Sequence, residues 1–423
     1  MQIGLLLTGN ELMTGDTVDS NSAYIARKLA ADGFDVAHKV TVGDQLDTLV
    51  AELAGLAGRY TVVIMNGGLG PTSDDLTAAA LAKLCNVPLC EHPEARAHLE
   101  YWCSKRGVAL NAANLKQAML PQAAKVLANP VGSAVGFCIE HQGCIILATP
   151  GVPGELRAML DGDVAQVLRN EFPDARARDI RRLKIFGIGE SGLQQKIDNH
   201  FTDWPAQVKI GFRAGAPLLE LKLEVEEQAA LPQRDQCEQQ LRELVGDYIV
   251  GENDDTLAAV VVELLARSGQ RLALAESCTG GGMAAQITAV PGASRVFEAG
   301  IVSYSNAVKH KVLGVPTQLL EQHGAVSEPV ALAMARGALE LAGADKVIAV
   351  TGIAGPDGGT TDKPVGTVWI AWGERDDLRA QHFCYPLSRQ LFQTMISALG
   401  LDLMRRMLQG VHAEPNYFRS RRK

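Results

Sequence analysis

The stretch LALAESCTGGGMAAQITAVPGASRVFEAGIVSYSNAVK, residues 272–309, indicates both the fold and the chemistry of the C-terminal part of the chain. Its apolar start predicts a buried strand, which turns at Ser277 and passes through three glycines into a helix that ends before Pro291. Residues 300–304 predict the next strand, so strand and helix alternate as in an α/β fold. A hydroxyl beside the unpaired N–H groups of a helix start can lie where an anion or an oxyanion binds.

Hydroxyl and amine side chains in this stretch form a candidate catalytic set. Ser277 and Ser294 are candidate nucleophiles, and since the stretch holds no histidine, a local base would be Lys309 or Tyr304. Lysine can act as a base where burial lowers its pKa. This predicts acyl transfer by a serine without a metal or cofactor. The alternative is that Ser277 and Thr279 only cap the helix, which is the commoner role of such residues.

The composition is that of a globular protein with more than one domain. The chain has 423 residues, enough for two or three domains, and its 47% hydrophobic and 21% charged residues are ordinary values. The net charge of −8 disfavours general nucleic-acid binding, which usually needs a basic surface. Eight irregularly spaced cysteines favour free thiols, and neither a signal peptide nor a membrane-length apolar run is found. We therefore expect a cytoplasmic protein without membrane contact.

The N-terminal part alternates strand and helix. Apolar or alternating runs predict strands at residues 2–7, 36–42 and 61–66, and helical spacing predicts helices at residues 21–32 and 46–57. This alternation implies a doubly wound parallel sheet with helices on both faces. In such sheets ligands bind beyond the carboxyl ends of the strands.

Two polar loops leave strand ends in this part, at residues 8–11 and 67–75. Glycines let the backbone approach a phosphate, and Asp74 and Asp75 could hold a hard cation that bridges phosphate oxygens. The alternative for both aspartates is the first turn of a helix, where the dipole favours them, and both roles can hold together. The loop is not a P-loop, because no Gly-Lys-Ser/Thr follows. A similar strand, turn and helix pattern at residues 144–155 is expected to line the same cleft.

A smaller α+β module is predicted in the middle of the chain, with about eighty residues, a normal domain size. Its strands and helices are expected at residues 182–186, 191–200, 208–213, 219–225 and 231–245. The segment GIGESG, residues 187–192, fits the G-x-G-x-x-G pattern, but a dinucleotide fold needs more parallel βαβ units than this module contains. We interpret these glycines as a turn and a helix cap.

Further elements complete the C-terminal part. Asp255 is expected to cap a helix at residues 256–266, and Ser327 a helix at residues 329–342. Three strands and a closing helix are predicted at residues 346–350, 365–372, 379–385 and 389–408. The glycine-rich segment 351–359 follows a strand end and could be a phosphate cradle or a plain loop.

Long motifs in the chain resemble the CinA family (competence/damage-inducible protein A), and the resemblance covers nearly the whole chain. The motifs, in chain order, are NGGLGPTSDDLT, AESCTGG, PGAS, VSYSNAVK, HGAVSEP and TGIAGPDGGTTDKPVGTVW. The resemblance implies a molybdopterin-binding-like domain at residues 1–170, a KH-type connector at 171–250 and a nicotinamide mononucleotide deamidase domain at 251–411. A basic tail, residues 412–423, is expected to be solvated.

For the C-terminal domain, the resemblance implies hydrolysis of nicotinamide mononucleotide to nicotinic acid mononucleotide and ammonia. The implied catalytic residues are Ser294, Ser277, Lys309 and Tyr304, and the implied substrate contacts are Thr351, Gly352, Arg389, Thr279 and Gly280. We predict Ser294 as the nucleophile, with neutral Lys309 as the base acting directly or through Ser277. The alternative makes Ser277 the nucleophile and keeps the same base.

For the N-terminal domain, the resemblance implies a metal-dependent ADP-ribose pyrophosphatase that uses Mg or Co, possibly with K. The implied substrate contacts are Asn10, Gly67, Gly68 and Gly70, and the implied metal ligands are Asp74, Asp75, Glu11 and Asp44. A homodimer is also implied. Two other functions stay open, namely a molybdopterin-related binding protein and a non-catalytic interaction protein of DNA uptake, although the negative charge disfavours DNA affinity.

Overall fold

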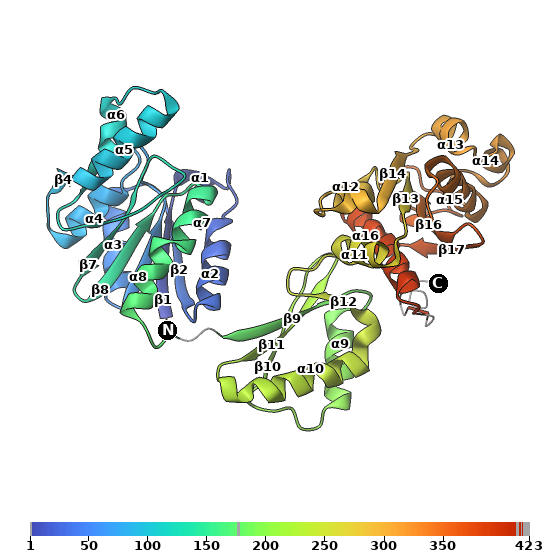
Figure 1. The fold of residues 1–423 in the computed structure, drawn as a ribbon, viewed down its shortest axis with the longest axis horizontal. Coiled ribbons are helices and arrows are strands. Elements are labelled where there is room, and N and C mark those ends of the chain that lie inside the picture. The colour runs from blue at the N-terminus through green and yellow to red at the C-terminus, as the bar shows by residue number, and fades with distance from the viewer. Residues whose placement is uncertain (1, 176–177, 412–413, 416, 418–423) are drawn as a thin grey trace. The chain divides into compact units, whose positions relative to one another are not determined.

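The computed structural model describes residues 2–175, 178–411, 414–415 and 417. The chain divides into two compact units, Met1–Asp179 and Ile180–Lys423 (Figure 1). The first unit is an α/β domain, and the second holds a small α+β domain followed by another α/β domain, so the predicted fold class is confirmed. No helix among the described residues is long and apolar enough to cross a membrane.

The N-terminal unit is built on a six-stranded mixed sheet in the order β2-β1-β3-β8-β7-β6. The first four strands in this order are parallel, whereas the last two run antiparallel at one edge. The strands are β1 (Gln2–Thr8), β2 (Asp35–Val42), β3 (Val62–Asn66), β6 (Lys125–Leu127), β7 (Gly136–His141) and β8 (Cys144–Thr149). A separate antiparallel pair joins β4 (Leu89–Glu91) to β5 (Met119–Pro121).

Helices cover both faces of this sheet. They are α1 (Asn10–Thr14), α2 (Asn21–Ala31), α3 (Leu46–Ala57), α4 (Thr77–Cys85), α5 (Pro93–Arg106), α6 (Ala112–Leu115), α7 (Pro153–Asp161) and α8 (Asp163–Glu171). Successive residues of a strand point to opposite faces. Leu6 therefore packs in the core with α3 and α4, while Leu5 and Leu7 pack in the core with α2, α7 and α8.

The middle domain is a four-stranded sheet in the order β10-β11-β9-β12 with helices on one face. Its elements are β9 (Asp179–Ile185), α9 (Glu190–His200), β10 (Lys209–Arg213), β11 (Leu219–Val225), α10 (Leu231–Val245) and β12 (Ile249–Glu252). Leu183, Leu221 and Leu223 face the two helices and form the core. The remaining strand positions, which alternate with these leucines, lie on the other face.

The C-terminal domain is a five-stranded sheet in the order β14-β13-β15-β16-β17, in which the first three strands are parallel. The strands are β13 (Leu272–Glu276), β14 (Phe297–Val302), β15 (Lys346–Gly352), β16 (Thr367–Glu374) and β17 (Asp377–Cys384). The helices are α11 (Leu257–Ser268), α12 (Gly282–Thr288), α13 (Asn306–Leu313), α14 (Thr317–His323), α15 (Glu328–Ala342) and α16 (Arg389–Leu408). Leu272 and Leu274 pack with α11, α12 and α16, whereas Ala273 and Ala275 pack with α15.

Of three local predictions in this domain, the one for Asp255 is wrong and the other two hold only in part. The strand predicted at residues 300–304 is present but ends at Val302: Ser303 N still donates to Glu276 O (2.8 Å), and Ser305 is already the N-cap of α13. Thr256 rather than Asp255 caps α11, since its side chain accepts from Ala259 N (3.1 Å) while Asp255 accepts from Glu252 N (2.8 Å). Ser327 occupies the N-cap of α15, but its hydroxyl donates back to a carbonyl of the preceding loop.

Tyr417 is buried between the middle and C-terminal domains. The basic end of the same tail, residues 419–423, lies outside the described residues. The ring centroid of Tyr417 lies 5.9 Å from that of Phe186 and 6.3 Å from that of Phe383. Its hydroxyl donates to Asp402 Oδ2 (2.7 Å). Burial, together with the Asp402 charge, raises the pKa of Tyr417 well above its ordinary value, so the hydroxyl remains a donor.

The GIGESG segment confirms the interpretation as a turn and helix start. Gly189 precedes the first residue of α9. Gly187 has a φ of 88°, and a Cβ placed on it would lie 2.8 Å from the Tyr417 ring. The first glycine of the pattern therefore allows close packing between domains.

We expect Tyr417→Phe to lower the melting temperature of the full chain by several degrees. The change leaves buried Asp402 without one of its donors, and an unsatisfied buried group costs about 1–3 kcal/mol. Tyr101→Phe is the matched control, because Tyr101 is exposed and the loss there should be close to zero. Equal melting temperatures for the Tyr417→Phe variant and the unmodified protein would contradict the expectation.

Candidate active sites

Ser277 lies in the turn that follows β13, at the carboxyl end of the central parallel strands. Its N–H donates to Val350 O (3.0 Å), which anchors the turn to the neighbouring strand. Gly280 and Gly281 have φ values of 65° and 96°, a region that favours glycine, so the glycines allow the chain to turn into α12. The side chain of Ser277 is thereby held at the edge of the sheet.

Lys309 reaches this turn from α13, whose N-cap Ser305 accepts from Val308 N. The side chain is almost fully buried, with 1% exposed. Its Nζ lies 2.9 Å from Ser277 Oγ, 2.7 Å from Ser303 O and 3.3 Å from Tyr304 O. The amine is therefore in direct contact with one of the two candidate nucleophiles.

No carboxylate among the described residues forms an ion pair with Lys309. The nearby carboxylate of Glu276 instead accepts from the Thr279 hydroxyl (2.7 Å), Met283 N (3.0 Å) and Ala284 N (2.8 Å). Burial lowers the pKa of Lys309 to about 8. A neutral amine has two N–H groups for the two carbonyl oxygens and one lone pair, which then faces the Ser277 hydroxyl.

Two expectations about the helix start are corrected by these contacts. The N–H groups of Met283 and Ala284 already donate to the Glu276 carboxylate, so these donors of α12 are not available to a bound anion or oxyanion. The N-cap of α12 is Gly281, and Thr279 donates to Glu276. Neither Ser277 nor Thr279 is therefore a helix cap.

Ser294 lies in a short 3-10 helix, η4 (Ala293–Arg295), and is exposed. In the part of the chain that the structure describes, Lys309 Nζ contacts three oxygen atoms, and Ser294 Oγ is not one of them. The geometry thus favours the alternative assignment, in which Ser277 is the nucleophile.

The remaining predicted residues of this site fall into two groups. Arg389 donates to Gly355 O and to Tyr304 Oη, both at 2.9 Å, and joins the glycine-rich loop to an exposed tyrosine. Thr351 is buried and donates to a loop carbonyl (2.8 Å), and a Cβ on Gly352 would lie 2.8 Å from a neighbouring strand carbonyl. The first pair can contact a substrate, while Thr351 and Gly352 hold the end of β15 in place.

In the N-terminal unit, a hollow of about 370 Å³ lies at the carboxyl ends of β1, β3 and β8. It is lined by most of the predicted residues: Glu11, Asp44, Gly67, Gly68, Gly70, Asp74 and Asp75. Pro150, Gly151 and Glu155 line it too, so the prediction that residues 144–155 border the same cleft is confirmed at these positions. Asn10 does not line it, but its side chain accepts from Asp44 N (3.1 Å).

The carboxylates that line this hollow differ in the hydrogen bonds that they accept. Asp44 accepts from the Thr8 hydroxyl (2.6 Å) and from Asn10 N (3.0 Å), so it joins the loop after β2 to the loop after β1. Asp75 accepts from Thr72 N (2.8 Å), and a hydrogen bond from the Thr72 hydroxyl holds the pKa of Asp74 below its usual range. No three His, Cys, Asp or Glu side chains of the described residues are grouped to hold a metal ion.

Comparisons with known proteins agree with this architecture. Successive parts of the chain match a probable molybdopterin binding domain (residues 4–170), a damage-inducible protein CinA KH domain (180–251) and the CinA C-terminal domain (254–408). A CinA-like protein from Colwellia psychrerythraea is 47% identical over 423 residues, which is 99% of this chain and 98% of that protein. The chain belongs to the CinA family.

Further CinA proteins are also similar. A CinA-like protein from Shewanella frigidimarina is 40% identical over 409 residues, or 96% of each chain. A crystal structure of a CinA superfamily protein from Klebsiella pneumoniae is 36% identical, covers 36% of this chain and 96% of that one, and has a TM-score of 0.36.

Sequence reasoning missed two residues of the CinA C-terminal domain that shape the turn. Glu276 is fully buried and accepts a hydrogen bond from the backbone at the start of α12. In the sequence it could have been recognised as a carboxylate that ends an apolar strand directly before Ser277. Gln393 donates from Nε2 to Cys278 O (2.9 Å), one turn after Arg389 in the predicted closing helix. Both residues position the Ser277 backbone without contacting Lys309.

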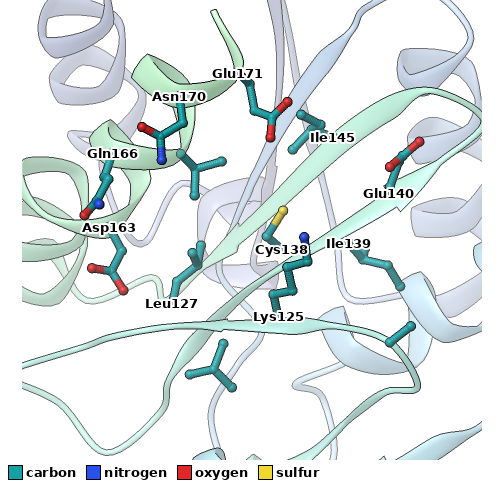
Figure 2. A pocket seen from close by; sticks show the side chains of 13 residues that line it. Lys125, Leu127, Cys138, Ile139, Glu140, Ile145, Asp163, Gln166, Asn170 and Glu171 are labelled. Carbon is teal, nitrogen blue, oxygen red and sulfur yellow. The ribbon is translucent and has the colours of Figure 1, made fainter.

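A second hollow of about 610 Å³ lies over β6 and β7 beside α8, and none of the predicted site residues lines it. Figure 2 shows the Cys138 side chain pointing into it between Lys125 and Glu171. Burial raises the pKa of the Cys138 thiol, which favours its protonated form. This hollow is separate from the CinA-family loops described above.

Proposed function

We propose that the C-terminal domain hydrolyses the carboxamide of nicotinamide mononucleotide to nicotinic acid mononucleotide and ammonia. The observation that carries the proposal is a buried Lys309 amine 2.9 Å from Ser277 Oγ that forms no ion pair with any carboxylate of the described residues. A serine beside a neutral lysine is a nucleophile with its own base. Membership of the CinA family supports the substrate class.

In the proposed reaction, Ser277 Oγ attacks the carboxamide carbon while its proton passes to Lys309 Nζ. The Lys309 ammonium then gives this proton to the leaving nitrogen as the C–N bond breaks, and ammonia departs. Water attacks the resulting ester and transfers a proton to the same amine, and the proton returns to Ser277 Oγ as the C–O bond breaks. Arg389 and Tyr304, which contact each other, would orient the nucleotide.

For the N-terminal domain we infer metal-dependent cleavage of ADP-ribose. The supporting observation is the glycine-lined hollow that Asp74, which is exposed, and Asp75, which is half-buried, also line. These two carboxylates fit a hard cation such as Mg or Co that completes its shell with water and phosphate oxygens. Such an ion would neutralise charge on the pyrophosphate. The match to a probable molybdopterin binding domain supports a second candidate, binding of a molybdopterin-related ligand in the same hollow.

Incubation with nicotinamide mononucleotide and with ADP-ribose, with and without EDTA, tests both halves. We expect ammonia release that EDTA leaves unchanged, because Ser277 and Lys309 need no metal. We expect AMP release from ADP-ribose to fall to background with EDTA and to return with Mg or Co. Absence of ammonia would refute the amidase proposal, and absence of AMP under every condition would favour the molybdopterin alternative.

Asp74→Asn provides the matched variant for this experiment. The change removes a charge from an exposed side chain whose bond to the Thr72 hydroxyl the amide can keep, so the fold should persist. Loss of AMP release with full ammonia release would support separate sites in the two halves. Equal AMP release by the variant and the unmodified protein would exclude Asp74 as a metal ligand.

The rate of deamidation should depend on pH through Lys309. Only the neutral amine accepts a proton, and the pKa of Lys309 is lowered to about 8 by burial. Below this value kcat/KM should rise about tenfold per pH unit, and above it the profile should level off. A profile that is flat from about pH 6 to pH 9 would contradict the role of Lys309 as base.

A further inference from the structure

The face of the middle sheet opposite its two helices carries a cluster of charges around Glu220. Antiparallel pairing places Arg213 opposite Glu220 in register, so both point to this face. Four cationic side chains reach the one carboxylate: Lys184 (2.7 Å), Arg213 (3.0 Å), Arg182 (3.7 Å) and Lys222 (3.8 Å). We call these five residues the Glu220 cluster.

The Glu220 cluster is not balanced in charge. Glu220 is 4% exposed, and although its burial alone would raise the value, Lys184 and Arg213 lower its pKa, so the carboxylate is ionised. Four positive charges therefore meet one negative charge, an excess of three. The adjacent Lys209 is matched separately by Glu226 (2.6 Å) and also lies opposite Glu224, which shares this face, in register. Since the whole chain has a net charge of −8, this local excess runs against the average of the protein.

Geometry keeps the cations available to a ligand. Arg182 and Lys184 come from β9, Lys222 from β11 and Arg213 from β10, so rigid strands hold them together. The side chain of Arg213 is 59% exposed, and those of Arg182 and Lys222 are each 33% exposed. Repulsion among clustered cations is relieved when a further anion binds over them. Guanidinium groups in particular match phosphate oxygens with two parallel hydrogen bonds.

We propose that the Glu220 cluster is a binding site for a phosphate- or pyrophosphate-bearing small anion. A phosphate monoester carries nearly two negative charges, which suits an excess of three positive charges. Single-stranded nucleic acid usually binds to surfaces that also stack its bases on aromatic side chains. The residues of β9, β10 and β11 that share the face of Glu220 include no aromatic side chain, so the phosphate group itself is the feature recognised.

Acetylation of lysines in the full chain, read by peptide mass spectrometry, tests this site apart from the other nucleotide sites. Inorganic pyrophosphate should slow acetylation of Lys184 and Lys222 by about threefold or more, because bound anion covers their amines. Lys83 is the control, since it lies on the other unit and pairs with Asp47 at 2.7 Å. Unchanged rates at Lys184 and Lys222 up to millimolar pyrophosphate would overturn the proposal.

Two variants are expected to change the protection of Lys184 and Lys222 by pyrophosphate in opposite directions. Glu220→Gln raises the excess charge, so half-maximal protection should require less pyrophosphate, whereas Arg213→Ala should require several times more. Arg213 is exposed, so its variant tests the site even if the change at buried Glu220 harms folding. Equal protection curves for Arg213→Ala and the unmodified protein would overturn the proposal. Stronger protection by a single-stranded oligonucleotide than by pyrophosphate would also overturn it, in favour of nucleic-acid binding.

Discussion

Lys309→Met is expected to lower kcat for nicotinamide mononucleotide deamidation by about 10³–10⁴-fold, because the proposed reaction then lacks its only base. Among the described residues, the amine is the one group in contact with Ser277 Oγ that can accept its proton, since Glu276 bonds to Thr279 and to the start of α12 instead. Methionine fills a similar volume without a lone pair of comparable basicity. Ammonia release under saturating substrate measures the effect.

The fold should survive this change. Burying an amine without a carboxylate partner is costly, and an apolar side chain removes that cost while leaving two carbonyl oxygens without their donor. We therefore expect a melting temperature within a few degrees of the unmodified protein. Lys311→Met, on the exposed side of the same helix, is the control and should keep full activity. A Lys309→Met variant that is folded and nearly as active would contradict the proposed chemistry.

Lys309→Arg separates charge from basicity. Arginine keeps a cation at the end of a long side chain but stays protonated under all ordinary conditions, so it cannot accept a proton. We expect it to be as inactive as Lys309→Met. Activity in this variant would mean that the cation stabilises a transition state rather than acting as a base.

Much of the fold follows from periodicity in the sequence. The apolar run before Ser277 reads as a strand because all five residues of β13 are buried between helices on both faces. Helices α2, α3, α10 and α16 begin and end within a residue or so of their expected limits, since apolar spacing and end signals agree there. The antiparallel edge strands β6 and β7 are missing from the sequence prediction, although β7 is joined to β8 by a two-residue turn at Gln142 and Gly143, both with positive φ.

The site is only partly encoded in local sequence. Proximity of Lys309 to Ser277 arises because parallel strands β13 and β14 end at one edge and α13 starts just beyond it, so their joint position follows from the fold. The role of Glu276 as the partner of α12 is not evident from the sequence, because its carboxylate accepts from backbone N–H groups seven and eight residues later in the chain. Likewise the engagement of Asp44 with Thr8 joins residues 36 positions apart, which spacing does not indicate. The homodimer and the cytoplasmic location stay predictions.

Ser277→Ala and Ser294→Ala together decide which serine is the nucleophile. We expect Ser277→Ala to lower kcat by about 10⁴-fold or more, since loss of a nucleophile removes the covalent route entirely. Ser294→Ala should cost at most about tenfold, because this exposed hydroxyl does not contact Lys309 among the described residues. Ammonia release measures both variants. The reverse order of effects would restore Ser294 as the nucleophile and make Ser277 a relay between it and the amine.

Ser277→Cys gives a readout that does not depend on activity. A thiol 2.9 Å from a neutral amine would lose its proton to that amine, so iodoacetamide should alkylate position 277 rapidly and Lys309→Met should abolish this reactivity. The neighbouring Cys278 is an internal control on the same peptide, because burial raises the pKa of its thiol to about 12 and keeps it unreactive. Alkylation at position 277 that does not depend on Lys309 would show that the amine does not activate this side chain.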